Sequence, residues 1–134
     1  MLSSSMSGTD STESSTDMSN SWISKNVRQR IYNRDNMVCC YCGITCVQCN
    51  TRESSNPGLG ATLDHIVPQK VLAESSINDK DFYAKRRDPR NLVVVCMSCN
   101  SSKQHTDLYT WCAITGKNYA KIIIEIGNRI SKGL

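Results

Sequence analysis

The chain has no apolar run near the roughly 18 residues that a membrane-spanning helix requires. Its longest apolar patch, "KIIIEI" at positions 121–126, is far too short. The N-terminus also lacks the basic start and apolar stretch of a secretory signal. We therefore expect a soluble, intracellular, cytoplasmic protein. Its 134 residues are enough for one domain with a single hydrophobic core.

Basic residues are missing from positions 1–24. That segment holds ten Ser and three Thr together with Asp10, Glu13 and Asp17. Such a composition buries too little apolar surface to offset the entropy of ordering, so we expect a disordered acidic tail at 1–24 and a folded domain at 25–134. The domain keeps all 16 basic residues against nine acidic ones, a formal balance of +7. This balance favours a polyanionic partner.

Histidine is scarce, with two residues, whereas cysteine is abundant, with eight. Six of the cysteines form Cys-x-x-Cys pairs: Cys39 with Cys42, Cys46 with Cys49, and Cys96 with Cys99. Two such pairs can present four thiolates in the tetrahedral arrangement that Zn²⁺ prefers. A thiol redox protein is the alternative, and the two separated pairs favour zinc over it.

The order of expected elements indicates an α+β domain. An amphipathic pattern at 24–35, with Ser24 as N-cap, predicts a helix before the first cysteine pair. Strands are expected at 61–68, ended by Pro68, and at 91–96, where the β-branched residues lie. Positions 74–90 are polar and predict a long connection. The pattern is helical from Ser98 onward, with a break at Gly116.

Three motifs occur in one order: "RDNMVCCYCG", "TLDHIVPQK" and "DPRNLVVVCMSCNSSKQ". Together they resemble the HNH endonuclease family, whose core is the ββα-metal fold. The resemblance covers about residues 28–104 and is specific because the separate motifs agree jointly. It implies a small ββα-metal core with a structural zinc and flanking helices. It also implies an enzyme that hydrolyses DNA phosphodiester bonds with a divalent cation.

Hydrolysis of a phosphodiester needs a base for the attacking water and a cation that stabilises charge on the phosphate. Histidine suits the base because its ordinary pKa, about 6.5, leaves it largely neutral at physiological pH. The resemblance implies that His65 is this base. It also implies that Asp64 and Asn100 bind the catalytic Mg²⁺ or Mn²⁺, whose preferred ligands are oxygens. Many family members have His where this chain has Asn100, so the resemblance implies an H-N-N variant.

The resemblance implies roles for two further polar residues. Asn91 would brace the loop that orients His65, and Lys103 would meet the substrate phosphate. It also implies the zinc set, which consists of Cys39, Cys42, Cys96 and Cys99.

Basic residues outside the motifs suggest how a phosphate backbone could be bound. Arg28, Arg34, Arg86 and Arg87 are the main candidates for such sequence-independent contacts. An ordinary solvated surface is the alternative for each of them.

Several interpretations stay open at this point. A non-catalytic zinc module that binds nucleic acid shares the cysteine pairs and the positive charge. The isoleucines of the last helix, Ile122, Ile123, Ile126 and Ile130, predict packing in the core, with a homodimer face as the alternative. Cys112 is expected in the core, and His105 at the surface. Cys46 and Cys49 are candidates for a second zinc site, and Cys40 is a substitute ligand for the first.

Overall fold

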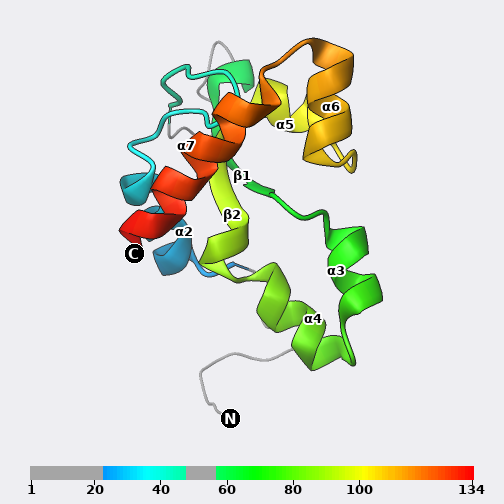
Figure 1. Cartoon of the computed structure of the whole chain (residues 1–134). Coiled ribbons are helices and arrows are strands. Elements are labelled where there is room, and N and C mark those ends of the chain that lie inside the picture. Colours follow the sequence, from blue (N-terminus) through cyan, green and yellow to red (C-terminus); the bar gives the residue numbers. More distant parts are fainter. Residues whose placement is uncertain (1–22, 48–56) are drawn as a thin grey trace.

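The computed structural model describes residues 23–47 and 57–134 (Figure 1). These residues form six α-helices and one two-stranded antiparallel sheet, which confirms the predicted α+β class. The helices are α2 (Lys25–Arg34), α3 (Gln69–Ser75), α4 (Asp79–Arg86), α5 (Met97–Lys103), α6 (Leu108–Thr115) and α7 (Tyr119–Lys132); the strands are β1 (Ala61–His65) and β2 (Leu92–Cys96).

The sheet lies at the centre of the described chain. β1 and β2 pair from Ala61 opposite Cys96 to His65 opposite Leu92. Every residue of β2 is buried, since α2 and α5 both contact this strand. A strand covered on both faces needs a continuous apolar sequence, and "LVVVC" provides one. The register places a cysteine at one end of the sheet and His65 at the other.

Helix α2 begins where the sequence predicts it. The Ser24 hydroxyl accepts a hydrogen bond from Val27 N at 3.1 Å, as expected of an N-cap. Ile31 and Tyr32 on the inner face are buried in the core. The predicted helix at 24–35 is therefore confirmed.

The polar segment at 74–90 is more ordered than the sequence suggests. It contains the end of α3, all of α4 and a 3₁₀ turn at Pro89–Asn91, so the prediction of a plain connection is wrong. Asn78 caps α4 by accepting from Asp81 N at 2.8 Å. No residue of α4 is buried, which explains why no apolar periodicity marks it. α3 and α4 pack against each other beside the sheet (Figure 1).

The C-terminal part folds into α5, α6 and α7. Gly116 ends α6 in a left-handed conformation, with φ at 75°, as its predicted role as a break requires. Cys112 is 1% exposed in the core, as predicted. Ile122 and Ile126 of α7 are also buried, whereas Ile123 is 40% exposed. Ile130 is partly buried and also packs against the core, so the predicted core face of α7 is correct for three of the four isoleucines.

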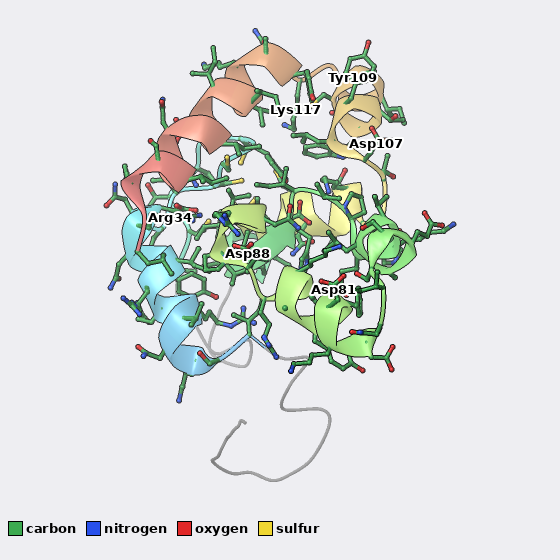
Figure 2. All side chains as sticks on the ribbon, turned by 60° about the horizontal axis from the view of Figure 1, so that its bottom comes forward. Arg34, Asp81, Asp88, Asp107, Tyr109 and Lys117 are labelled. Carbon is green, nitrogen blue, oxygen red and sulfur yellow. The ribbon has the colours of Figure 1, made fainter. Side chains whose placement is uncertain are left out.

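A buried ionic cluster joins α2 and α7 to β2. The Asp35 carboxylate contacts Arg34 Nε at 2.6 Å and Arg129 Nη1 at 3.4 Å, and it accepts from Val94 N at 2.9 Å. Arg34 also donates to the Leu92 carbonyl at 2.6 Å. Figure 2 shows Arg34 at the junction of these elements. The predicted phosphate contact of Arg34 is therefore wrong, because its side chain is 2% exposed and fully used inside the fold.

Two other expectations concern residues beyond the described ones. The predicted acidic tail at 1–24 lies outside the described residues except for Ile23 and Ser24. Cys49, and with it the predicted second zinc site, also lies outside them. In residues 23–47 and 57–134, no helix is both long enough and apolar enough to cross a membrane.

Candidate metal centre and neighbouring cleft

Four thiols from two separate segments converge next to the sheet. Cys39 and Cys42 lie in the turn after α2, whereas Cys96 ends β2 and Cys99 lies in the first turn of α5. All four sulfurs lie within 4.8 Å of one another, and the Sγ atoms of Cys42 and Cys96 are 3.8 Å apart. Bonds of about 2.3 Å from sulfur to a tetrahedral Zn²⁺ require sulfurs about 3.8 Å apart. The cluster could therefore hold a zinc ion.

The local backbone explains how each pair is held. In both pairs the first sulfur accepts a hydrogen bond from the backbone N–H of the second cysteine. The distances are 3.4 Å from Cys42 N to Cys39 Sγ and 3.5 Å from Cys99 N to Cys96 Sγ. Gly43 follows the first pair with φ at 80°, a conformation that glycine adopts without strain.

The thiols of the cluster differ in acidity. Burial raises the pKa of Cys39, but hydrogen bonds from neighbouring backbone N–H groups outweigh it and leave this pKa below its ordinary value. Burial and the neighbouring thiols raise the pKa values of Cys42 and Cys99. Metal binding to such a cluster requires these thiols to lose their protons, so zinc binding would release protons.

Two further described cysteines lie near this cluster but do not belong to the group of four. Cys40 and Cys46 are buried, and burial raises the pKa of each to about 12. Cys39 rather than Cys40 belongs to the group of four. Within residues 23–47 and 57–134, no second group of three or more potential ligands from His, Cys, Asp and Glu occurs.

A cleft of about 550 Å³ opens beside β1 and α5. Its walls include Asp64 and His65 from β1, Asn100 from α5, Arg28 from α2 and Arg86 from α4. Five of the residues that the sequence singled out therefore share one cavity. The lining includes one acidic residue and two arginines, so the cleft offers positive charge to an anionic ligand such as a phosphate.

His65 is held by both of its ring nitrogens. Nε2 lies 2.9 Å from the backbone carbonyl of Arg86, and Nδ1 lies 3.5 Å from Gln69 Nε2. A carbonyl only accepts hydrogen bonds, so Nε2 carries the proton, and the lone pair of Nδ1 accepts a long hydrogen bond from the Gln69 amide. Burial lowers the pKa of His65 below its ordinary value, which keeps the ring neutral.

Asp64 is 6% exposed and binds two buried partners with one oxygen. Its Oδ2 accepts from the Tyr41 hydroxyl at 2.5 Å and lies 3.0 Å from Lys103 Nζ. Lys103 also approaches the His65 carbonyl at 3.5 Å. The phosphate contact predicted for Lys103 does not fit this placement, because only 1% of its side chain is exposed. Lys103 lies beneath the cleft, as the counter-charge of Asp64.

The two asparagines lie on either side of His65. Asn91 binds the backbone of Val67 with both polar atoms of its side chain, in the loop that follows His65. Asn100 donates from Nδ2 to Thr62 Oγ1 at 2.9 Å, which anchors it to β1. Its Oδ1 accepts no hydrogen bond from any residue that the structure describes.

The predicted phosphate-binding arginines thus have different surroundings. Arg28 and Arg86 line the cleft, Arg34 is buried, and Arg87 is half-buried outside the lining. His105, predicted at the surface, is exposed at the rim of the cleft.

Three contacts to site residues were not anticipated from the sequence. Tyr41 lies within the first cysteine motif, but nothing in the sequence predicts that its hydroxyl binds Asp64, which is 23 positions away. Gln69 follows His65 by four positions and reaches the imidazole because it is the first residue of α3. The spacing alone does not predict this contact. The contact from Arg86 is made by its backbone carbonyl, which every residue has, so residue type cannot predict it.

Comparisons of the chain with protein-family models, with curated proteins and with solved structures found no match.

Proposed function

We propose that this protein is a divalent-metal-dependent endonuclease of the HNH type, with β1, β2 and α5 as its ββα-metal core and the four-cysteine cluster as its structural zinc site. Its substrate would be the phosphodiester backbone of DNA. The observation that carries the proposal is the state of His65. Its ring is neutral, its proton is fixed on Nε2, and Nδ1 is the nitrogen that can take a proton, in a cleft that also contains Asp64 and Asn100. The 3.5 Å contact from the Gln69 amide to Nδ1 would give way to the attacking water.

The roles of the residues follow from this geometry. His65 Nδ1 takes a proton from a water molecule as the water oxygen bonds to phosphorus and the bond to the leaving sugar oxygen breaks. Arg28 and Arg86 bind the phosphate backbone by charge. Asn91 holds the loop after His65 and so keeps the ring in place.

Two oxygen-bearing side chains of the cleft fit a hard cation. Asp64 offers a carboxylate oxygen and Asn100 an amide oxygen, which are ligands that Mg²⁺ and Mn²⁺ accept. Such a cation would supply positive charge for the phosphate and the leaving oxygen. The four thiols are unsuited to this cation and suited to zinc.

The test is cleavage of supercoiled plasmid by purified zinc-loaded protein, with Mg²⁺ or Mn²⁺ added. Wild type should nick the plasmid, His65→Ala should lose at least about 100-fold in rate, as removal of a general base does, and both proteins should melt at the same temperature. His105→Ala is the matched control, since it removes the other histidine and should retain most activity. Cleavage by His65→Ala at the wild-type rate would refute the mechanism. Plasmid binding without cleavage by wild type would favour the non-catalytic zinc module.

The substrate class is tested by comparing the cleavage of a single-stranded RNA with that of a DNA of the same length, under the metal conditions of the plasmid assay. Preferential cleavage of RNA would contradict the proposal for DNA while leaving the roles of His65 and Asp64 unchanged.

A further inference from the structure

The Asp64 carboxylate is bound asymmetrically. Tyr41 and Lys103 both contact Oδ2, at 2.5 and 3.0 Å, whereas Oδ1 makes no hydrogen bond or ion pair with any described residue. All three side chains are at least nine-tenths buried. Asp64 is nevertheless one of the residues that line the cleft. One oxygen is therefore fixed inside the fold, and the other remains for a ligand.

Two donors on the same oxygen restrict the carboxylate strongly. Hydrogen bonds to an ionised acceptor are short and about twice as strong as neutral ones. Tyr41 and Lys103 approach from different elements, one from the turn after α2 and the other from α5. Rotation of the carboxylate would break both contacts in a buried environment, where unpaired polar groups are costly.

Tyr41 is itself held by its place in the chain. It lies between Cys39 and Cys42, so two cysteines of the candidate zinc site fix its backbone. Its ring packs against Trp111, with ring centroids 5.2 Å apart. The hydroxyl therefore connects the zinc site with Asp64 through one rigid side chain.

We propose that Tyr41 is a positioning residue for catalytic cation binding: together with Lys103 it occupies Oδ2 of Asp64 and orients Oδ1 toward the cation. This inference rests on the proposed function, because it assumes that Asp64 binds the divalent cation. It assigns a role beyond folding to the turn that contains Cys39 and Cys42, since this turn carries the hydroxyl that orients the ligand.

The experiment measures Mn²⁺ binding directly, by the loss of the electron paramagnetic resonance signal of free Mn²⁺ on titration with zinc-loaded protein. Tyr41→Phe removes the hydroxyl and keeps the ring that packs on Trp111. Loss of a residue that orients a metal ligand typically weakens metal binding about 10- to 100-fold, so we expect at least a tenfold rise in the Mn²⁺ dissociation constant. Half-maximal cleavage should require a proportionally higher Mn²⁺ concentration.

Tyr32→Phe is the matched control. Tyr32 is equally buried, and its hydroxyl also binds β1, but it donates to the Ala61 carbonyl at 3.3 Å rather than to a carboxylate. We expect this variant to bind Mn²⁺ within about twofold of wild type, since it leaves Asp64 untouched. Zinc content and melting temperature are measured for all three proteins.

The possible outcomes separate the two proposals. An unchanged Mn²⁺ dissociation constant in Tyr41→Phe overturns the inference and leaves the nuclease function intact. Loss of zinc or of the cooperative melting transition in Tyr41→Phe also overturns it, because the hydroxyl would then act in folding. If wild type neither binds Mn²⁺ nor cleaves plasmid, the proposed function fails, and the inference fails with it.

Discussion

Asn91 binds both backbone polar groups of Val67. Its Oδ1 accepts from Val67 N at 2.8 Å, and its Nδ2 donates to the Val67 carbonyl at 3.1 Å. The backbone carbonyl of Asn91 also accepts from Ile66 N at 2.9 Å. The 3₁₀ turn just before β2 thereby holds the two residues that follow His65, so Asn91 helps to fix the position of the imidazole.

Asn91→Ala should therefore lower both stability and activity. Loss of two hydrogen bonds from a half-buried side chain costs about 1–2 kcal/mol of unfolding free energy. The cleavage rate should fall further than this loss of folded protein explains, because His65 is no longer held. Single-turnover cleavage and urea unfolding of the same preparation distinguish the two effects. A stability loss with a normal rate would mean that Asn91 supports only the fold.

The zinc site gives a prediction about folding. Cys99→Ser should abolish stoichiometric zinc binding and the cooperative melting transition, because the binding energy of a structural zinc is folding energy. Cys112→Ser is the control: Cys112 is equally buried but lies outside the group of four. Metal analysis and thermal melting suffice. Equal zinc content in the two variants would refute the four-cysteine assignment.

The buried ion pair between Asp64 and Lys103 should matter far more than a surface pair. Lys103→Met leaves a buried carboxylate without its cation, which costs about 3–5 kcal/mol. The control is Lys85→Met, which removes a partly exposed pair with Asp81 and costs about 0–1 kcal/mol. Asp81 lies on α4, where its side chain is 31% exposed (Figure 2). Chemical denaturation compares the two losses, and equal losses would contradict the buried placement of Lys103.

The pH dependence of cleavage should reflect His65. Its neighbours shift its pKa in opposite directions. Burial lowers the pKa most, and the charges of Arg86 and Lys103 lower it further, whereas the Arg86 carbonyl and Asp64 raise it. The net shift is downward, so the base stays neutral to a lower pH than a free histidine. Activity should be retained below pH 6.5 and lost only as the pH falls through the lowered pKa. A pH–rate profile with its acid limb at or above 6.5 would contradict this.

The same lowered pKa links pH to stability. Because the unfolded chain takes up a proton on this histidine before the folded chain does, unfolding becomes easier as the pH falls below about 6.5. His65→Gln should remove that part of the pH dependence. Urea unfolding of both proteins between pH 5 and 7 measures it.

The arginines of the cleft should determine how DNA binding responds to salt. Each phosphate contact contributes about one unit to the slope of log affinity against log salt. Arg28→Ala and Arg86→Ala should each reduce that slope by about one. Arg90→Ala should not, because Arg90 pairs with Asp88 outside the cleft lining. Fluorescence anisotropy with a DNA duplex at several salt concentrations gives the slopes.

The sequence predicts those features that depend on local pattern or fixed spacing. The Ser24 cap, the β-branched strand before Cys96 and the break at Gly116 are local signals, and all three are present. The cysteine pairs predict a four-thiol cluster because zinc coordination fixes their spacing, and the cluster forms.

Features that depend on tertiary placement were not accessible in the same way. Arginine is a common phosphate-binding residue, so the sequence suggested this role for Arg34. Only the fold reveals that its guanidinium group binds Asp35 and two backbone carbonyls. Lys103 was likewise predicted to bind phosphate, and only the fold shows that it is buried in an ion pair with Asp64. Helix α4 was not predicted because none of its residues is buried, so its sequence shows no apolar periodicity.

The acceptor that holds His65 is a peptide carbonyl, and every amino acid at position 86 would provide one. Substitutions along α4 should therefore leave His65 in place as long as they preserve the helix, and only Arg86 has a proposed role of its own in DNA binding. A single-residue insertion or deletion in α4 is different, since it would rotate the last carbonyls away from the imidazole by about 100°. For anyone redesigning this protein, the length of α4 is a stricter constraint than its sequence.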